Sequence, residues 1–367
     1  MGVASLTLFL FVSPGLNCHA QPSFEMLYVK ATNGTLSSAE RDAAFTTASR
    51  LCPGDVGLYT GYSSFLLAQG QFGSALKIAS SGLQWSSANS KLRLNKAIAL
   101  YSLRRARESL EILNDLPPSA EVSFYQGLNQ IRLAEHAEAR KSLRRAWESG
   151  YRDPHLLYLL IEEDHATQDK AAGLADFQTM LQQYPDSAWL HMALGNAAFA
   201  LEKDQQARSE YERALALNTQ LPNANFRLGY LAYQAGQDEI ASRYFLNELA
   251  VDPEHADAAL FEGETLKRLG RTREAIPYLK NALALDPASA QAYGTFATAL
   301  IETGQSHDAV NVLLRAEARF PTDPAFPAQL ARLFARLDRK DDADKASERV
   351  RALLAIKRKK EESTVKQ

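Results

Sequence analysis

The strongest candidate for chemistry in this sequence is a short cluster of histidine and carboxylate side chains. Glu162 and His165 lie three residues apart and share one face of an expected helix, and His155 precedes Glu162 by about two turns. Histidine and glutamate are ordinary zinc ligands, but a closed zinc site takes four ligands. No fourth ligand stands at a suitable spacing, so we expect no metal and no cofactor.

The motifs that carry most enzyme chemistry are absent from the 367 residues. The chain has no CxxC, HExxH, GxSxG or P-loop sequence, and no GxGxxG that follows a strand. Its 41 basic and 43 acidic residues give a net charge of -2, which offers no excess of positive charge to nucleic acid or an anionic membrane. We therefore predict a protein that is not an enzyme, with no catalytic residues and no nucleic-acid partner.

Residues 1–20 contain no Asp, Glu, Lys or Arg and resemble a secretory signal peptide. The apolar run Val3–Val12 is too short to span a bilayer, and the helix-breaking residues 13–15 and the small Ala20 follow it. We expect cleavage after Ala20 and an exported protein, periplasmic or secreted. In the alternative, the segment is retained as an N-terminal membrane anchor, which is then the chain's only contact with a membrane.

A small residue recurs along the chain with a period of 34 residues, and one shorter repeat interrupts the series. A second small position lies twelve residues before the first in every repeat but one, where Ile161 replaces it and Asp164 is also unusual. Glycine inside a helix costs about 0.5–1 kcal/mol relative to alanine, so its recurrence at Gly195 and Gly229 predicts a close approach of two helices. The first series is Ala75, Ser109, Ala139, Gly173, Ala207, Ala241, Ala275, Ala309 and Ala343.

Each repeat has the apolar period of two helices, with turn residues between them. Two stretches, Asn223–Pro253 and Ala258–Pro287, carry the same types of residue in the same order. The order is a Leu-Gly pair or its equivalent, then an alanine, then an aromatic residue or a leucine, then a second alanine and finally a proline. On these residues the sequence resembles the tetratricopeptide repeat (TPR) family, over about residues 56–356. The resemblance implies an all-α fold, an α-solenoid in which stacked helical hairpins form a right-handed superhelix with a continuous core.

The repeat period also divides the chain into predicted regions. These are the signal peptide or anchor in 1–20, a degenerate N-terminal helical cap in 21–55, about nine repeats in 56–357 and a charged tail in 358–367. In the cap, Arg41 stands where the repeats have a small residue. The predicted repeats are 56–89, 90–119, 120–153, 154–187, 188–221, 222–255, 256–289, 290–323 and 324–357.

The resemblance further implies where a ligand would bind. In the TPR family the first helix of each hairpin lines the concave face, and ligand contacts cluster at repeat positions 2, 5, 9 and 12. Four successive repeats offer aromatic residues there, and Trp189 and Tyr230 stand where the family pattern does not favour an aromatic. The predicted peptide-binding residues are Phe124, Tyr158, Trp189, Asn196, Phe199, Phe226, Tyr230 and Tyr233.

A groove lined by large rigid side chains favours an extended peptide or a helix of a partner protein. We therefore predict a non-catalytic scaffold or adaptor whose partner is a protein or peptide, with the oligomeric state left open. One alternative is an envelope assembly or secretion component, of the polysaccharide-export or outer-membrane assembly type. The second alternative is a metal- or ligand-binding sensor or enzyme built on the histidine cluster.

Overall fold

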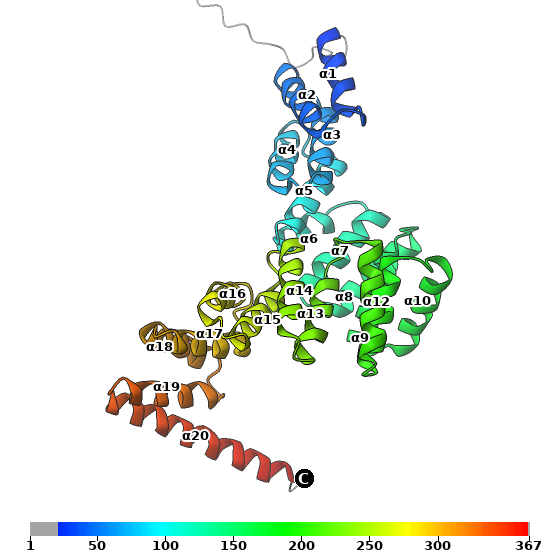
Figure 1. The fold of residues 1–367 in the computed structure, drawn as a ribbon. Coiled ribbons are helices and arrows are strands. Elements are labelled where there is room, and N and C mark those ends of the chain that lie inside the picture. Colours follow the sequence, from blue (N-terminus) through cyan, green and yellow to red (C-terminus); the bar gives the residue numbers. More distant parts are fainter. Residues whose placement is uncertain (1–20, 366–367) are drawn as a thin grey trace, which may run out of the picture. The chain divides into compact units, whose positions relative to one another are not determined.

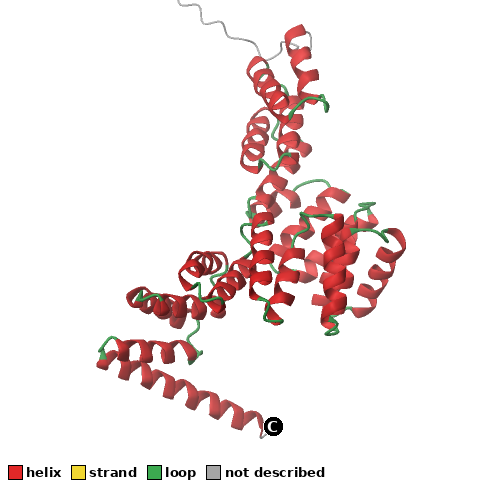
Figure 2. Cartoon of the chain, in the orientation of Figure 1, coloured by secondary structure: helices red, strands yellow, loops and turns green. Residues whose placement is uncertain are grey.

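The computed structural model describes residues 21–365, which form twenty α-helices joined by short turns (Figures 1 and 2). No strand occurs in this part of the chain. Consecutive helices pack as hairpins in chain order, which confirms the predicted all-α fold of sequential helical hairpins. No helix between residues 21 and 365 is both long and apolar enough to cross a membrane. The predicted signal peptide lies outside the described residues.

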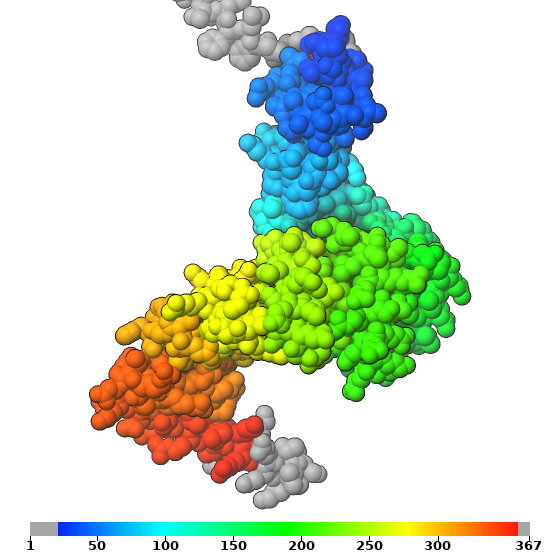
Figure 3. Space-filling view, in the orientation of Figure 1, coloured from blue at the N-terminus to red at the C-terminus, as the bar shows by residue number. Residues whose placement is uncertain are grey.

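The helices fall into two compact units that divide between Gln183 and Tyr184. Within each unit, neighbouring hairpins lie in direct contact along the chain (Figure 3). The N-terminal unit contains α1 (Pro22–Thr32), α2 (Ser38–Leu51), α3 (Val56–Ala68), α4 (Phe72–Trp85), α5 (Ser90–Ser102), α6 (Ala106–Asn114), α7 (Ala120–Arg132), α8 (His136–Glu148), α9 (Pro154–Ala166) and α10 (Lys170–Gln183). The C-terminal unit contains α11 (Ala188–Ala200), α12 (Asp204–Leu217), α13 (Ala224–Gln234), α14 (Asp238–Val251), α15 (Ala256–Arg268), α16 (Thr272–Leu285), α17 (Ala290–Glu302), α18 (Ser306–Arg319), α19 (Ala325–Arg336) and α20 (Lys340–Val365).

Most first helices of the hairpins begin at a side chain that caps the backbone. Asp55, Ser187 and Ser289, for example, each accept a hydrogen bond from the backbone N–H three residues later, which satisfies a donor that the helix leaves unpaired. Helix α13 differs, because Asn223 before it has a φ of +67° and no capping side chain. The buried carboxylate of Glu248 on α14 takes the place of a cap. It accepts hydrogen bonds from the backbone N–H of Asn223 at 2.7 Å and from that of Phe226 at 3.1 Å.

The recurring small residues mark the closest approach of the two helices in a hairpin. Ala241 is fully buried, as are most members of the 34-residue series. A Cβ added at Gly195 would lie 2.4 Å from the ring of Tyr211, sixteen residues later, and one at Gly229 would lie 2.7 Å from Phe245 at the same spacing. The glycines therefore leave room for a large side chain of the second helix, and this side chain fills the hairpin core.

The two ends of the array differ in detail from the repeats between them. Arg41, which replaces the small residue in α2, places its guanidinium 4.5 Å from the ring centre of Phe65 and donates to the backbone oxygen of Ala31 at 3.0 Å. The long side chain of this α2 residue therefore contacts both α1 and α3. At the other end, α20 continues to Val365, so residues 358–365, which we assigned to a charged tail, extend the last helix.

Ala241→Leu is expected to lower the free energy of unfolding by about 1–3 kcal/mol, because extra methylene groups overpack a full core. The matched control is Ala318→Leu, since Ala318 is an exposed residue of α18 in the same C-terminal unit; it should change stability by less than about 0.5 kcal/mol. Urea denaturation followed by circular dichroism compares the two. Equal midpoints would show that the small residues are not needed for helix contact.

Candidate functional site

Two of the eight predicted ligand contacts lie in the N-terminal unit, and both are buried. Phe124 on α7 is 5% exposed and Tyr158 on α9 is 9% exposed. The ring of Phe124 stacks on Tyr151 with the ring centres 4.4 Å apart. These two residues contribute to packing within their unit, and a ligand would reach little of their surface.

The other six predicted residues lie on α11 and α13 of the C-terminal unit, and all are partly exposed. Asn196 accepts a hydrogen bond of 2.9 Å from the hydroxyl of Tyr211 on α12. Its amide oxygen therefore joins the two helices of its own hairpin. The aromatic members are Trp189, Phe199, Phe226, Tyr230 and Tyr233.

Four of these aromatic rings form one row with a fifth, Phe261 of α15, which the sequence analysis missed. Tyr230 is central, because its ring centre lies 5.1 Å from Phe261, 6.0 Å from Phe199 and 6.2 Å from Phe226. The ring of Tyr233 lies 5.3 Å from that of Phe261. We call these five residues, Phe199, Phe226, Tyr230, Tyr233 and Phe261, the aromatic ladder. It crosses three successive first helices, α11, α13 and α15.

A polar edge fixes one end of the aromatic ladder. The Tyr233 hydroxyl donates to Glu264 Oε2 at 3.0 Å, while Gln291 and Thr295 of α17 each donate to Glu264 Oε1 at 2.9 Å. Burial raises the pKa of Tyr233, and the neighbouring Glu264 carboxylate raises it further. The phenol therefore stays protonated at neutral pH and remains a hydrogen-bond donor to Glu264.

An arginine covers the outer face of Tyr233. The Arg268 guanidinium lies 4.4 Å from the Tyr233 ring centre and donates to the Tyr233 backbone oxygen at 3.0 Å. The N-terminal unit repeats this arrangement, with Arg132 over the ring of Tyr101 at 4.3 Å and bonded to its backbone oxygen. We call it the arginine staple. It joins the ends of two successive first helices, so the aromatic residue at this position has a structural role in both repeats.

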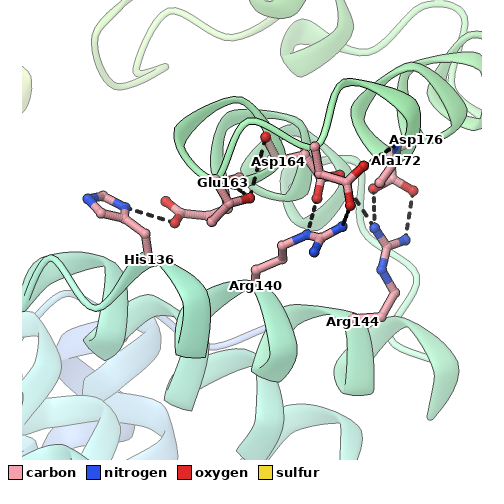
Figure 4. Close-up of polar contacts among 9 residues, drawn as sticks. His136, Arg140, Arg144, Glu163, Asp164, Ala172 and Asp176 are labelled. Atoms are coloured by element: carbon pink, nitrogen blue, oxygen red, sulfur yellow. Dashed lines mark hydrogen bonds and ion pairs between the residues drawn. The ribbon is translucent and has the colours of Figure 1, made fainter.

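The N-terminal unit also contains a partly buried ion-pair network between α8 and the hairpin of α9 and α10 (Figure 4). Arg140 of α8 binds the carboxylates of Asp164 and Asp169. Arg144, one turn later, binds Asp176 at 2.6 and 2.8 Å and lies 3.5 Å from Asp164. Asp164 is fully buried, which explains why this repeat departs from the usual pattern at that position.

The electrostatics of this network follow from burial and from direct hydrogen bonds. The bond to Asp164 raises the pKa of Arg140, and the bond to Asp176 raises that of Arg144. Burial raises the pKa of Asp164, while the hydrogen bond from Arg140 opposes that rise. All the charges have partners, so the network links neighbouring hairpins and offers no reactive group.

The histidine cluster does not assemble into a site in the structure. Burial lowers the pKa of His155 to about 4, whereas His165 is exposed. Glu163, the neighbour of Glu162, is the carboxylate that meets a histidine, with His136 Nδ1 2.9 Å from its Oε2. Among the described side chains of residues 21–358, no group of three His, Cys, Asp or Glu is placed to hold a metal ion.

Comparison with known sequences identifies the repeats. Two family models, each described as tetratricopeptide repeat, match residues 66–128 and 266–333 in one case and 226–290 in the other. The chain is a tetratricopeptide repeat protein. Proteins of this family generally mediate protein–protein interactions and are typically non-catalytic. No curated protein sequence matches the chain.

Solved structures of MamA proteins resemble part of this TPR protein. One, named "MamA RS-1 ArsTM double mutant", is 20% identical with a TM-score of 0.45 and covers 47% of this chain and 97% of its own. Another, from Desulfovibrio magneticus RS-1, has 21% identity, a TM-score of 0.43 and the same coverage. A third MamA structure is 17% identical with a TM-score of 0.45, and covers 48% of this chain and 96% of its own. At this level of similarity, nothing about the ligand is transferred.

Proposed function

We propose that this TPR protein is a non-catalytic scaffold that binds a peptide segment or helix of a partner protein on the aromatic ladder. The observation that carries the proposal is the continuity of the ladder, in which partly exposed rings follow one another across α11, α13 and α15. A peptide that crosses several repeats meets one ring after another on such a surface. Large aromatic side chains supply much of the binding energy in protein interfaces.

The ladder packs on the aromatic core of the same hairpins, since the rings of Phe226 and Phe261 each lie 5.9 Å from that of Phe245, but it is more exposed than this core. Tyr211 and Phe245 on the second helices are fully buried, so neither ring is open to a ligand. Phe226, Tyr230 and Phe261 are partly exposed, so these residues leave some surface open to water in the free protein. Covering that apolar surface with a ligand is favourable by about 25 cal/mol per Å².

The polar edge around Glu264 prepares the ladder for binding. Its carboxylate accepts three hydrogen bonds from side chains of α13 and α17, and the arginine staple covers the far side of Tyr233. These contacts hold the ring of Tyr233 in one orientation before a ligand arrives. A surface that is ordered in advance loses less conformational entropy when it binds.

Tyr230→Ala is expected to weaken binding of a ladder peptide about thirtyfold, which corresponds to about 2 kcal/mol for a central aromatic anchor. Because the ring is partly exposed and touches three others, we also expect a smaller loss of stability, about 1–2 kcal/mol. Peptides selected from a random display library on the purified wild-type protein provide the probe. Fluorescence anisotropy then gives the dissociation constants of the selected peptides.

Two controls make this test decisive. Tyr230→Phe keeps the ring and should keep the affinity. Phe245→Ala removes a fully buried ring and should cost about 3–5 kcal/mol of stability, which shows how a core position behaves in the same assay. If Tyr230→Ala destabilises the protein as much as Phe245→Ala and the selected peptides still bind, the ladder is core and the proposal is wrong.

A further inference from the structure

A groove lies between two successive first helices near the C-terminal end of the array, α17 and α19. Its volume is about 430 Å³, within the range of roughly 300–1,000 Å³ typical of ligand pockets. Small and apolar side chains form much of its lining, and two arginines stand on one face of α19, one turn apart. The lining residues are Thr298, Ile301, Ala325, Ala328, Gln329, Arg332, Leu333 and Arg336.

The two arginines of this groove have no partner within the described chain. Arg332 and Arg336 are exposed, and neither forms an ion pair, a hydrogen bond or a ring contact with the side chains that the structure describes, those of residues 21–358. By contrast, Arg268 of α15 pairs with Asp238 at 3.0 Å and also forms the arginine staple. Arg339, just after α19, lies 4.4 Å from the ring centre of Phe334.

The repeat register explains why Arg336 is left free. Arg336 follows Arg268 by two repeat lengths and stands at the same position of its first helix. The staple requires an aromatic ring at the end of the preceding first helix, as at Tyr233. Ile301 of α17 occupies the corresponding position, so it offers the guanidinium no π face. The aliphatic side chain lines the groove instead.

The acidic side chains near the groove, including Asp338 two residues after Arg336, form no ion pair with either arginine. Glu302, next to Ile301, lies 3.5 Å from Lys267 Nζ and accepts a hydrogen bond of 3.2 Å from Thr272. Asp323, just before α19, accepts from the backbone N–H of Ala325 at 2.9 Å. The positive charge of Arg332 and Arg336 is therefore not neutralised by these carboxylates.

We propose that the groove between α17 and α19 binds an acidic segment of a partner protein, in which carboxylates alternate with apolar side chains. The carboxylates would bond to Arg332 and Arg336, whose planar guanidiniums suit bidentate contacts. The apolar side chains would lie on Ile301, Ala325 and Ala328. The proposal rests on the scaffold role proposed above, and it adds a second contact region whose specificity comes from charge.

The test measures binding of a fluorescein-labelled nine-residue peptide in which aspartate and leucine alternate. We expect it to bind wild-type protein and to bind more weakly as salt rises, because exposed charges are screened. Arg332→Ser with Arg336→Ser should weaken it about a hundredfold, since each charge-assisted hydrogen bond lost contributes about tenfold. Arg332→Lys with Arg336→Lys keeps the charge and should retain part of the affinity.

The matched control is Arg315→Ser with Arg319→Ser. It changes the net charge equally at two exposed arginines of α18 outside the groove and should leave the affinity near wild type. A peptide with serine in place of aspartate should bind poorly. Equal loss in the two double variants, or equal binding of the serine peptide, would overturn the proposal.

The ladder variant separates this inference from the proposed function. Tyr230→Ala should bind the aspartate peptide as wild type does, whereas the Arg332→Ser, Arg336→Ser variant should keep its affinity for the selected ladder peptides. If Tyr230→Ala does not weaken binding of the ladder peptides but the aspartate peptide behaves as described, the groove proposal is supported and the proposed role of the ladder is wrong. If only the aspartate peptide fails, the groove proposal alone is wrong.

Discussion

Arg144→Met is expected to lower the free energy of unfolding of the N-terminal unit by about 2–3 kcal/mol, less than the roughly 3–5 kcal/mol found when one partner of a fully buried ion pair is removed, because the Arg144 side chain is 31% exposed. Asp176 loses both of its hydrogen bonds to the guanidinium. Asp164, which is fully buried, then faces Asp176 with Arg140 as its remaining cation. Repulsion between two close carboxylates makes it unfavourable for both to be ionised, so one of them is expected to take up a proton.

This loss should depend on pH and should be reversible by a second substitution. In the variant, repulsion between the two carboxylates raises the folded-state pKa of the aspartate pair. The folded protein then binds a proton that the unfolded chain does not, so the lost stability should be partly regained as the pH falls toward about 5. Adding Asp176→Leu removes the unpaired charge and should restore most of the stability. Arg145→Met, at an exposed neighbour on α8, is the control. A small loss without pH dependence would show that the network contributes little.

Glu262→Gln is expected to stabilise the C-terminal unit at pH 8 by up to about 3 kcal/mol and to have little effect at pH 4.5. Glu262 is 1% exposed, and its Oε2 finds no hydrogen-bond partner among the described residues, while Ser242 donates to Oε1 at 2.8 Å. Burial raises the pKa of this carboxyl from 4.5 to about 7. One pKa unit corresponds to about 1.4 kcal/mol, which sets the upper limit.

The sign of the pH dependence follows from proton binding. The folded protein holds the Glu262 proton more tightly than the unfolded chain, so the stability contributed by this group is complete below about pH 4.5 and is lost as the pH rises to about 7. Glutamine cannot ionise, so the difference between variant and wild type should grow over this interval. Urea midpoints measured from pH 4.5 to pH 8 test this. Glu239→Gln, at an exposed residue of α14, should show no such growth.

Several features of this protein were determined by the sequence alone because they depend on local periodicity. The 34-residue spacing of small residues, such as Ala241 and Ala275, requires helix pairs that approach closely, and the structure shows these residues fully buried. The all-α fold and the TPR family follow from the same repetition. The positions of Phe226 and Tyr230 on a first helix also follow from it, since side chains four residues apart share a helix face.

The tertiary structure decided which of these side chains have partners, because the partners lie about one repeat away along the chain. Phe124 and Tyr158 occupy ligand positions by register but are buried in their own unit. Phe261 joins the aromatic ladder through its contact with Tyr230 of the preceding repeat. The sequence of its own repeat does not predict that contact. Arg268 and Arg336 share one register position, yet only the first has an aromatic ring beneath it. A helical period fixes the face on which a side chain stands, whereas the burial and charge that it meets there depend on the neighbouring repeat.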